Sequence, residues 1–430
     1  MKPILQVALD FVELERALKV ARESVRGGAD WLEAGTPLIK SEGLEAVRKL
    51  REEFPRHTIV ADMKTADTGR LEVEIAAKAG ADIVCVLGGV SEATIRECLE
   101  AGKNYGARIM VDLLEVERVV EKAKKLEKWG ADIIGVHTPI DAQMRGEDPF
   151  KELKEIVKVV KIPVAIAGGI NSETAPQAVE AGASIIIVGG AIIKSPDAEE
   201  ATRKIKESIV KRKPISTFLY KRVRGEKIRK ILEVVSTPNI SDALHRQGTL
   251  KGIKPVVKGV KMVGRAVTVR TYPGDWAKPV EAIDVAEPGD VIVIDAGGVE
   301  PAVWGELATW SCLRKGIKGV VIEGAIRDVP EVEKLKFPAF ARLTTPNAGE
   351  PKGFGEIGVP IVVGGQRIFP GDWLVGDDDG VVVIPKEKVE EVANRAMDVL
   401  ERENRIRKEI QEGGTLGSVT ELLKWEKKHS

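Results

Sequence analysis

Short apolar runs alternate with amphipathic stretches through the first half of the chain. The amphipathic stretches carry Leu, Val and Ala at helical spacing among Lys, Glu and Arg, which is the pattern of surface helices. The apolar runs between them have the length and composition of buried strands. These predicted strands cover residues 4–10, 30–35, 58–64, 82–88, 108–114, 133–138, 163–169 and 184–190.

A repeated tripeptide marks the ends of several predicted helices. Gly-Ala-Asp stands at 28–30, 80–82 and 130–132, and Gly-Ala-Ser stands at 182–184. Gly commonly ends a helix, so each copy is a helix stop that leads into the next parallel strand. Eight strand–helix units in one domain-sized segment predict a (β/α)8 barrel, or TIM barrel, which a helix over 197–212 would close.

The second half has a different pattern. Strands are predicted at 256–271, 291–295, 318–323, 360–363 and 380–385, with many Gly and Pro residues from 346 to 380 and an amphipathic helix over 386–411. The segment 213–225, which precedes this second half, is basic and is interrupted by Pro214 and Gly225, as expected of a linker. We therefore predict a barrel over 1–212, a linker over 213–225, a smaller α/β domain over 226–386, and a C-terminal helix with a charged tail over 387–430.

Composition narrows the classes of protein. The 430 residues exceed one ordinary core, and an apolar content of 43% suffices for two packed domains. Lys plus Arg and Asp plus Glu both number 66, and this balance gives no field that attracts nucleic acid. Without a signal peptide or an apolar run of about 18 residues, we expect a cytoplasmic protein without membrane contact. The three cysteines, Cys85, Cys98 and Cys312, lack metal-ligand spacing.

An Asp-x-Lys-x-x-Asp motif follows the third predicted strand. Alternation along a strand places Asp62 and Lys64 on one face, and Asp67 follows on the loop. Two acids and a cation at one strand end can hold a metal, stabilise an oxyanion and transfer protons. A solvated charge cluster is the simpler interpretation of the motif when it is taken alone.

Other polar residues fall at the same ends of the predicted strands, where TIM barrels form their active sites. Each has an ordinary explanation, such as a helix cap, a core histidine or a turn, but together they mark one mouth. The glycine pairs after strands seven and eight are expected to bind phosphate through backbone amides. The set comprises Asp10, Glu33, Asp112, His137, Gly168, Gly169, Gly189 and Gly190.

With Asp10, Glu33 and the Asp62–Asp67 motif, residues 1 to about 210 resemble the orotidine-monophosphate-decarboxylase suprafamily. Its metal-free members carry Lys at the position of Glu33. Its magnesium-dependent members carry Glu there, as this chain does. Those members are 3-keto-gulonate-6-phosphate decarboxylases or 3-hexulose-6-phosphate synthases. The decarboxylases carry Glu, Arg and Thr where this chain has Asp112, Ile140 and Ala167, a set that resembles the synthases. The stretch 137–143 is also similar to the synthase loop, except for Pro139, where Gly is common.

This resemblance implies an aldehyde-lyase that reversibly joins ribulose 5-phosphate to formaldehyde. The sequence does not determine in which direction the reaction runs physiologically. It implies Mg2+ or Mn2+ held by Glu33 and Asp62, and Lys64 stabilising the enediolate. His137 is the candidate base, because imidazole suits proton transfer near neutral pH. Asp10 and Asp112 complete the catalytic set, and Asp67 is implied to reach the site of a partner in a dimer. The alternative is a 3-keto-gulonate-6-phosphate decarboxylase with a non-catalytic second domain.

A second group of motifs lies in the other half. Gly305-Glu306 begins a predicted helix, and Arg327-Asp328 follows a predicted strand. With the stretch 370–380, they resemble the ribonuclease-regulator-A-like family, which includes class II pyruvate aldolases and implies a swivelling-type α/β domain. Glu306 replaces the Asp of those aldolases.

For this half we expect Asp328 and Glu306 to bind a metal, and Arg327 and the Gly305 backbone to bind a carboxylate. Two alternatives remain, a lyase of a 2-oxo acid or a non-catalytic module. Since the barrel family pairs and the second family forms trimers, the fusion implies a homo-oligomer, with a hexamer as the smallest closed form.

Overall fold

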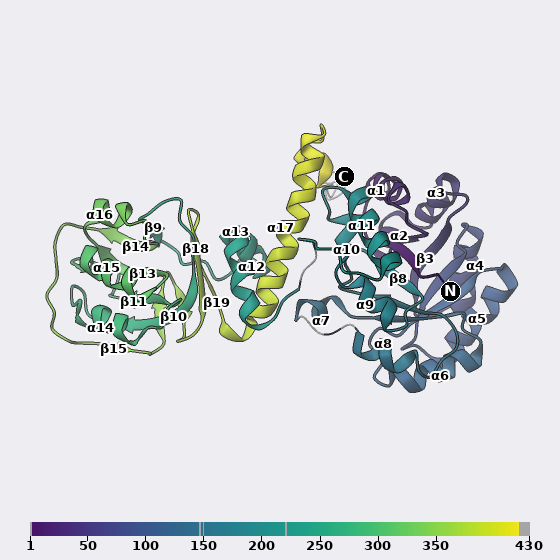
Figure 1. Ribbon diagram of the computed structural model, residues 1–430, viewed down its shortest axis with the longest axis horizontal. Helices are drawn as coiled ribbons and strands as arrows, with labels where there is room; N and C mark the ends of the chain where they lie inside the picture. Colours follow the sequence, from purple (N-terminus) through teal and green to yellow (C-terminus); the bar gives the residue numbers. More distant parts are fainter. Residues whose placement is uncertain (1, 146–147, 149, 220–221, 421–430) are drawn as a thin grey trace, which may run out of the picture. The chain divides into compact units, whose positions relative to one another are not determined.

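The computed structural model describes residues 2–145, 148, 150–219 and 222–420. They form two compact units (Figure 1). The first comprises Met1–Gln143, Glu147–Arg222 and Glu401–Ser430, and the second comprises Met144–Gly146 and Val223–Leu400. Residues 421–430 of the expected charged tail lie outside the described residues. Within the described residues, no helix combines the length and apolar character that crossing a membrane requires.

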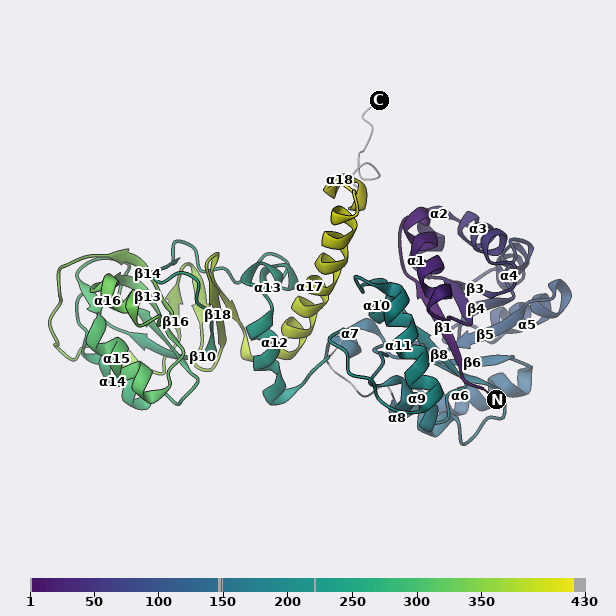
Figure 2. The same cartoon turned by 45° about the horizontal axis from the view of Figure 1, so that its top comes forward.

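The first unit contains a closed barrel in which each strand pairs in parallel with the next and β8 returns to β1 (Figure 2). This confirms the TIM barrel and all eight predicted strands. The strands are β1 Ile4–Leu9, β2 Trp31–Ala34, β3 Thr58–Thr65, β4 Ile83–Leu87, β5 Arg108–Asp112, β6 Ile133–His137, β7 Val164–Ala167 and β8 Ile185–Val188.

Helices cover the outside of this barrel, and their apolar faces pack on the strands in one buried core. They are α1 Leu14–Arg26, α2 Thr36–Glu42, α3 Glu45–Glu53, α4 Gly69–Lys78, α5 Glu92–Tyr105, α6 Val119–Trp129, α7 Ile140–Met144, α8 Phe150–Ile156, α9 Ala175–Glu180, α10 Gly190–Ile193 and α11 Ala198–Lys211. The first unit also includes Glu401–Gln411 of α17 (Val389–Gln411) and α18 Leu416–Val419.

The repeated tripeptides have two structural roles. Their glycines, at 28, 80, 130 and 182, have φ between 96° and 106°, a backbone that favours Gly and ends the helix. All three aspartates of these tripeptides accept a hydrogen bond from the amide of the second residue of the preceding strand. The pairs are Asp30 with the Leu5 amide at 2.7 Å, Asp82 with Ile59 at 2.8 Å and Asp132 with Ile109 at 2.8 Å. The motif therefore fixes the end of the barrel opposite to the expected active site.

The second unit is built on a mixed sheet of order β19-β18-β10-β11-β13-β14-β9, with β12 beside β13 and β15 beside β10. The pairs β10–β11, β11–β13 and β13–β14 are parallel. The strands are β9 Lys254–Pro255, β10 Met262–Arg270, β11 Val291–Asp295, β12 Ala302–Trp304, β13 Gly319–Ile326, β14 Ala339–Thr344, β15 Glu356–Ile357, β18 Trp373–Asp377 and β19 Gly380–Ile384, with a separate hairpin of β16 Ile361–Val363 and β17 Gln366–Ile368.

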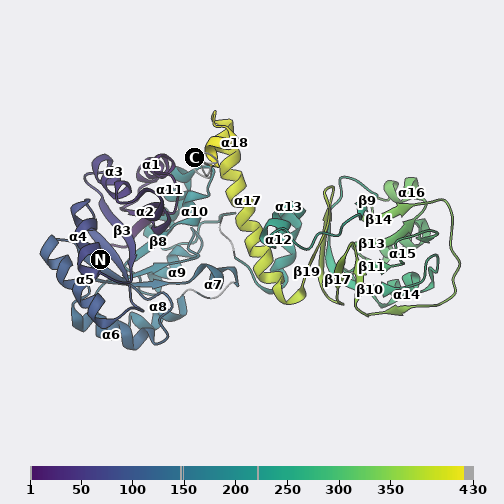
Figure 3. The same cartoon turned by 180° about the vertical axis from the view of Figure 1, so that it is seen from behind.

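Helices cover two regions of this sheet (Figure 3). Those beside β10, β11 and β13 are α14 Ala277–Val285, α15 Glu306–Lys315 and α16 Val329–Lys334. Those packed with β18 and β19 are α12 Ile228–Val234, α13 Thr237–Ala243 and the first turns of α17, with short 3-10 turns at Gly225–Lys227 and Lys386–Lys388. An α/β second domain is confirmed. The strands β9, β12, β14, β15, β17 and β18 were not predicted, because they are short or because polar residues and Gly interrupt their apolar runs.

Candidate functional site

Four polar side chains from β3, β5 and β6 meet inside the barrel mouth. Lys64 Nζ lies 3.1 Å from Asp62 Oδ2 and 3.1 Å from Asp112 Oδ2. His137 Nδ1 lies 3.0 Å from the same Asp112 oxygen. The sequence placed these residues at one end of the strands, and the structure joins them into one hydrogen-bonded chain.

The backbone at Lys64 departs from an ordinary strand. Lys64 has φ of 46°, a left-handed conformation that is costly for a residue with a side chain. The pairing of β3 with β4 shifts register between Ala61 and Thr65, as at a β-bulge. Simple alternation therefore does not account for the direction of Lys64, which this irregular stretch aims at its two carboxylates.

The charges in the cluster stabilise one another. Burial disfavours the charged form of Lys64, but the carboxylates of Asp62 and Asp112 outweigh it and raise the pKa of this lysine. Burial also opposes the charged form of Asp112, but the hydrogen bond and charge of His137, together with Lys64, hold the pKa of this carboxyl below its ordinary value. When Nδ1 of His137 carries a proton, the ionised Asp112 accepts a hydrogen bond from it, and Nε2 is then the nitrogen placed to act as a base.

Glu33 is a buried carboxylate beside two others. Desolvation, followed by the negative charges of Asp62 and Asp10, raises the pKa of Glu33 well above its ordinary value. Asp10 lies open to solvent at the rim but is crowded by protein atoms, and this desolvation with the charge of Asp62 raises its pKa as well. A Cβ at Gly35 would lie 2.2 Å from Asp10 Oδ1, so a side chain at this position would displace the Asp10 carboxylate.

Two residues that position this cluster were not predicted. Gln6 Nε2 donates to Glu33 Oε2, and Gln6 Oε1 is buried without a hydrogen-bond partner. Thr36 Oγ1 donates to Asp62 Oδ2 at 2.7 Å. Gln6 could have been found from strand alternation, since it stands on the same face of β1 as Asp10.

These oxygen donors fit a hard divalent cation. A cation between Glu33 and Asp62 would relieve the repulsion that raises the pKa of Glu33, and Mg2+ is commonly held by one or two carboxylates plus substrate oxygens and water. Within the described residues, no group of three or more His, Cys, Asp or Glu side chains has the arrangement of a metal site. Substrate and water would therefore have to complete the ligand set. The inner cavity, about 40 Å³, has room for about three water-sized groups.

Replacing Glu33 with Gln should stabilise the metal-free protein above pH 5. Because the pKa of Glu33 is raised on folding, its protonated carboxyl contributes to the free energy of unfolding. That contribution is fully present below the pKa of the unfolded state and is lost as pH rises through the pKa of the folded state. Gln remains neutral throughout, and a gain of about 1 kcal/mol corresponds to about 2–4 °C in the melting temperature of a domain of this size.

The check is thermal unfolding in a chelator at pH 4 and pH 8, with exposed Glu52→Gln as the control. Glu33→Gln should have a higher melting temperature than the parent at pH 8 but not at pH 4. Added Mg2+ should no longer raise the melting temperature of this variant. A lower melting temperature at pH 8 would show that the charged carboxylate of Glu33 is accommodated without a metal.

The remaining barrel candidates lie around the mouth. Asp67 is exposed on the loop after β3, where it accepts a hydrogen bond from the Thr68 amide at 2.8 Å, and the described contacts do not bring it to the cluster. Gly168 and Gly169 follow β7 with φ of 98° and 73°. The second glycine pair, Gly189 and Gly190, ends β8 and begins α10, and a Cβ at Gly189 would lie 3.1 Å from Asp10 Oδ2.

In the second unit, the structure shows which groups occupy the start of α15. Asp328, in a left-handed conformation with φ of 60°, accepts a hydrogen bond from the Glu306 amide at 3.2 Å and lies 3.4 Å from Arg327 Nε. A Cβ at Gly305 would lie 2.5 Å from this carboxylate. The side chain of Glu306 accepts a hydrogen bond from Trp310 Nε1 at 3.2 Å instead. The position expected for a bound carboxylate is thus filled by Asp328 itself, beside a groove of about 320 Å³.

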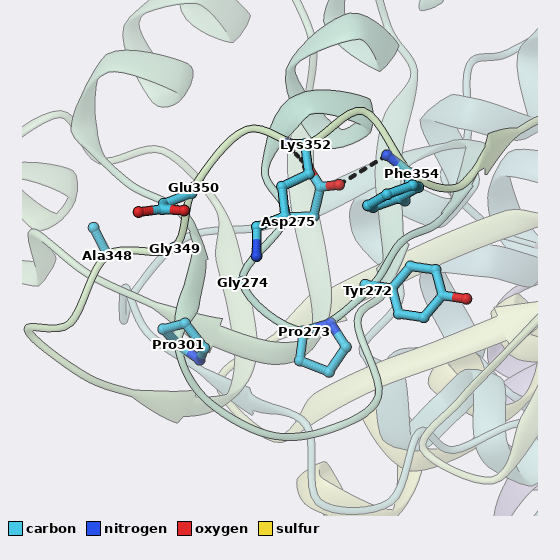
Figure 4. Close-up of a pocket in the computed structure, with 10 residues that line it drawn as sticks. All are labelled: Tyr272, Pro273, Gly274, Asp275, Pro301, Ala348, Gly349, Glu350, Lys352 and Phe354. Carbon is cyan, nitrogen blue, oxygen red and sulfur yellow. Dashed lines mark hydrogen bonds between the residues drawn. The ribbon is translucent and has the colours of Figure 1, made fainter.

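Figure 4 shows a larger pocket of about 590 Å³. Ala348 and Gly349 line both this pocket and the groove. The loop of the pocket is held by Asp275, whose carboxylate accepts hydrogen bonds from the amides of Ala277, Lys352, Gly353 and Phe354 at 2.8–3.3 Å. Burial would raise the pKa of Asp275, but these amides hold it below its ordinary value. Asp275 is therefore a structural anchor of the loop and has little capacity left for a ligand.

Two family models match the chain. The orotidine 5'-phosphate decarboxylase / HUMPS family matches residues 3–205, and the RraA-like family, described as Aldolase/RraA, matches residues 237–383. A 3-hexulose-6-phosphate synthase of Bacillus subtilis (strain 168) is 40% identical over 207 residues, which are 48% of this chain and 98% of that protein.

Two solved structures are also similar to the barrel. A 3-hexulose-6-phosphate synthase from Salmonella typhimurium is 35% identical, with a TM-score of 0.47, and the match covers 49% of this chain and all of that chain. A 3-keto-L-gulonate-6-phosphate decarboxylase from Vibrio cholerae is 28% identical, with a TM-score of 0.46, over 50% of this chain and all of that one. Both resemblances drawn from the sequence are confirmed by the family matches: through its first half the chain belongs to the orotidine 5'-phosphate decarboxylase / HUMPS family, and this half is fused to an RraA-like domain.

Proposed function

We propose that the barrel is an aldehyde-lyase that condenses ribulose 5-phosphate with formaldehyde to a hexulose 6-phosphate, with Mg2+ or Mn2+ held by Glu33 and Asp62. The observation that carries this proposal is the hydrogen-bonded chain of Lys64, Asp112 and His137. It supplies a cation for a developing oxyanion and an oriented base within one site. The 40% identity to a protein named 3-hexulose-6-phosphate synthase supports the same reaction.

The residues divide the reaction between them. Nε2 of His137 removes a proton from C1 of ribulose 5-phosphate, while Asp112 holds the imidazole through Nδ1 and stabilises the imidazolium that forms. Lys64 donates to the enediolate oxygen, and a bound divalent cation would add electrostatic stabilisation. C1 then attacks the carbon of formaldehyde, and the new alkoxide takes the proton from the imidazolium. The backbone at Gly168–Gly169 and Gly189–Gly190 binds the phosphate in this proposal.

The alternative reaction is decarboxylation of 3-keto-gulonate 6-phosphate. That substrate carries a carboxylate that must be held by a donor when it binds, before it departs as CO2, and this chain has exposed Ile140 at the start of α7 and Ala167 at the end of β7. Both lack a donor for a carboxylate, which favours the small uncharged partner formaldehyde.

The proposed function is tested by offering the purified protein ribulose 5-phosphate with 13C-formaldehyde, and separately 3-keto-gulonate 6-phosphate. We expect 13C in a new hydroxymethyl group, dependent on added Mg2+ or Mn2+ and lost in a chelator. Release of CO2 from the second substrate, with no incorporation of formaldehyde, would assign the decarboxylase reaction instead.

For the second unit, the two alternatives differ in whether a cation binds. A metal-dependent 2-oxo-acid lyase requires Asp328 to bind a cation, for instance through Oδ1 while Oδ2 accepts the bond from the Glu306 amide, whereas a non-catalytic module needs no cation there. The half-exposed Arg327 beside the groove supports binding of an anionic small molecule in either case. Calorimetry of the intact protein with oxalate, with and without Mg2+, separates a metal-dependent site from a metal-independent one.

A further inference from the structure

Two segments that follow α11 lie against the two loops proposed to bind phosphate. The first is 213–219, which runs along the loop after β7. The second is the part of α17 from Glu401 onward, which belongs to the first unit and reaches the loop after β8. The matches to the HUMPS family end at residue 205, before either segment begins. These contacts are therefore additions to the barrel that the family model describes.

The first segment is tied to the loop after β7 by a reciprocal pair of hydrogen bonds. The Ile215 amide donates to the Ser172 carbonyl at 3.0 Å, and Ser172 Oγ donates to the Ile215 carbonyl at 2.8 Å. The Thr217 amide donates to Glu173 Oε1 at 3.0 Å. Ser172 is buried and stands just after Gly168–Gly169, so this clamp limits the movement of the glycine loop.

The second segment contributes one buried arginine. The side chain of Arg405 is 4% exposed, and its Nη1 donates to the Ser195 carbonyl at 3.1 Å. Glu23 on α1 and Glu409 on α17 hold the same guanidinium at 3.1 and 2.9 Å. Burial disfavours the charge, but these two carboxylates outweigh it and raise the pKa of Arg405. A charged and fixed guanidinium thus grips the backbone of the loop after β8.

The gripped backbone is directly joined to the proposed site. Ser195 follows α10, which begins at Gly190. Lys194 stands in the sequence between α10 and Ser195. Burial and the charge of Asp62 raise the pKa of Asp10 in the barrel mouth, and the positive charge of Lys194 opposes them with a smaller effect. A shift of the backbone at Ser195 would move both the amides at Gly190 and the Lys194 charge.

We propose that Arg405 is a positioning residue for the phosphate site, because it fixes the loop after β8 so that the Gly189–Gly190 amides and the Lys194 charge meet the phosphate of the substrate. The substrate class, a sugar phosphate, rests on the proposed function. Residues from Glu401 onward, which lie outside the family match and belong to the first unit, would then contribute to substrate affinity in the barrel.

The test uses the full-length protein and compares Arg405→Met with Arg407→Met, a control on the same helix whose exposed side chain pairs with Glu403. Ser172→Ala is the second test variant, since it removes one hydroxyl from the other clamp and should fold normally. We expect Arg405→Met to raise the KM for ribulose 5-phosphate and the inhibition constant of inorganic phosphate about 10-fold, which is about 1.4 kcal/mol, with kcat and the KM for formaldehyde little changed. Ser172→Ala should act in the same direction more weakly.

A purely structural role gives a different result. It would lower the amount of active protein, and so the apparent kcat, without changing phosphate affinity in the folded fraction. Unchanged phosphate affinity in both test variants would overturn the proposal. Calorimetry with inorganic phosphate tests the positioning role of Arg405 separately from the proposed reaction. If Arg405→Met binds phosphate more weakly and the parent protein never consumes formaldehyde, the positioning role is supported and the proposed reaction is refuted.

Discussion

Lys64→Met is expected to lower kcat/KM for ribulose 5-phosphate by about 10²–10³-fold, the cost of removing one donor to a developing oxyanion. The loss also acts through its neighbours, because Asp62 and Asp112 would keep their negative charges without the cation between them. Without Lys64 the pKa of Asp112 should rise, so the acidic limb of the pH–rate profile should move to higher pH.

Steady-state kinetics from pH 3 to 9 measure both effects, since the pKa of Asp112 in the parent protein lies below its ordinary value. Lys78→Met is the control, since this exposed lysine on α4 pairs only with groups on the barrel surface in the described contacts. A variant with a near-normal rate and an unmoved acidic limb would show that Lys64 maintains structure and does not take part in the reaction.

Asp62→Asn should also lower the rate by about 10²-fold or more, because a lost metal ligand removes several kcal/mol of stabilisation of the enediolate. The fold should persist, since Asn can still accept the hydrogen bond of Thr36 Oγ1. Removing the charge should also let Glu33 ionise more easily, since Asp62 is the first charged neighbour that raises its pKa.

The effect is checked by activity and by Mn2+ binding measured by paramagnetic resonance. Asp82→Asn is the matched control, because Asp82 lies at the opposite end of the barrel strands and binds Arg51 and the Ile59 amide. If Asp62→Asn retains normal Mn2+ affinity, the metal lies elsewhere.

The barrel could be predicted from the sequence because its signals are local and repeated. Each strand is an apolar run, and each Gly-Ala-Asp tripeptide both ends a helix and supplies a carboxylate to the preceding strand. The polar residues at the strand ends were identified for the same reason, since the fold places all these ends at one mouth.

Other features depend on contacts that no local pattern encodes. The left-handed backbone of Lys64 and the support of Glu33 by Gln6 arise from packing between strands. In the second unit, the motif Arg327-Asp328 suggested an anion site, but only the folded loop shows that Asp328 itself caps the start of α15. The contact of Arg405 with Ser195 joins residues more than two hundred positions apart.

Hydrogen exchange measures directly whether the barrel forms an enediolate by removing the C1 proton of ribulose 5-phosphate. The protein is incubated with ribulose 5-phosphate in D2O without formaldehyde, and deuterium at C1 is followed by nuclear magnetic resonance. We predict exchange of one C1 hydrogen that requires Mg2+ or Mn2+ and is lost in His137→Asn. Absence of exchange in the metal-loaded parent protein would contradict enediolate formation, and equal exchange in His137→Asn would contradict the role of His137 as the base.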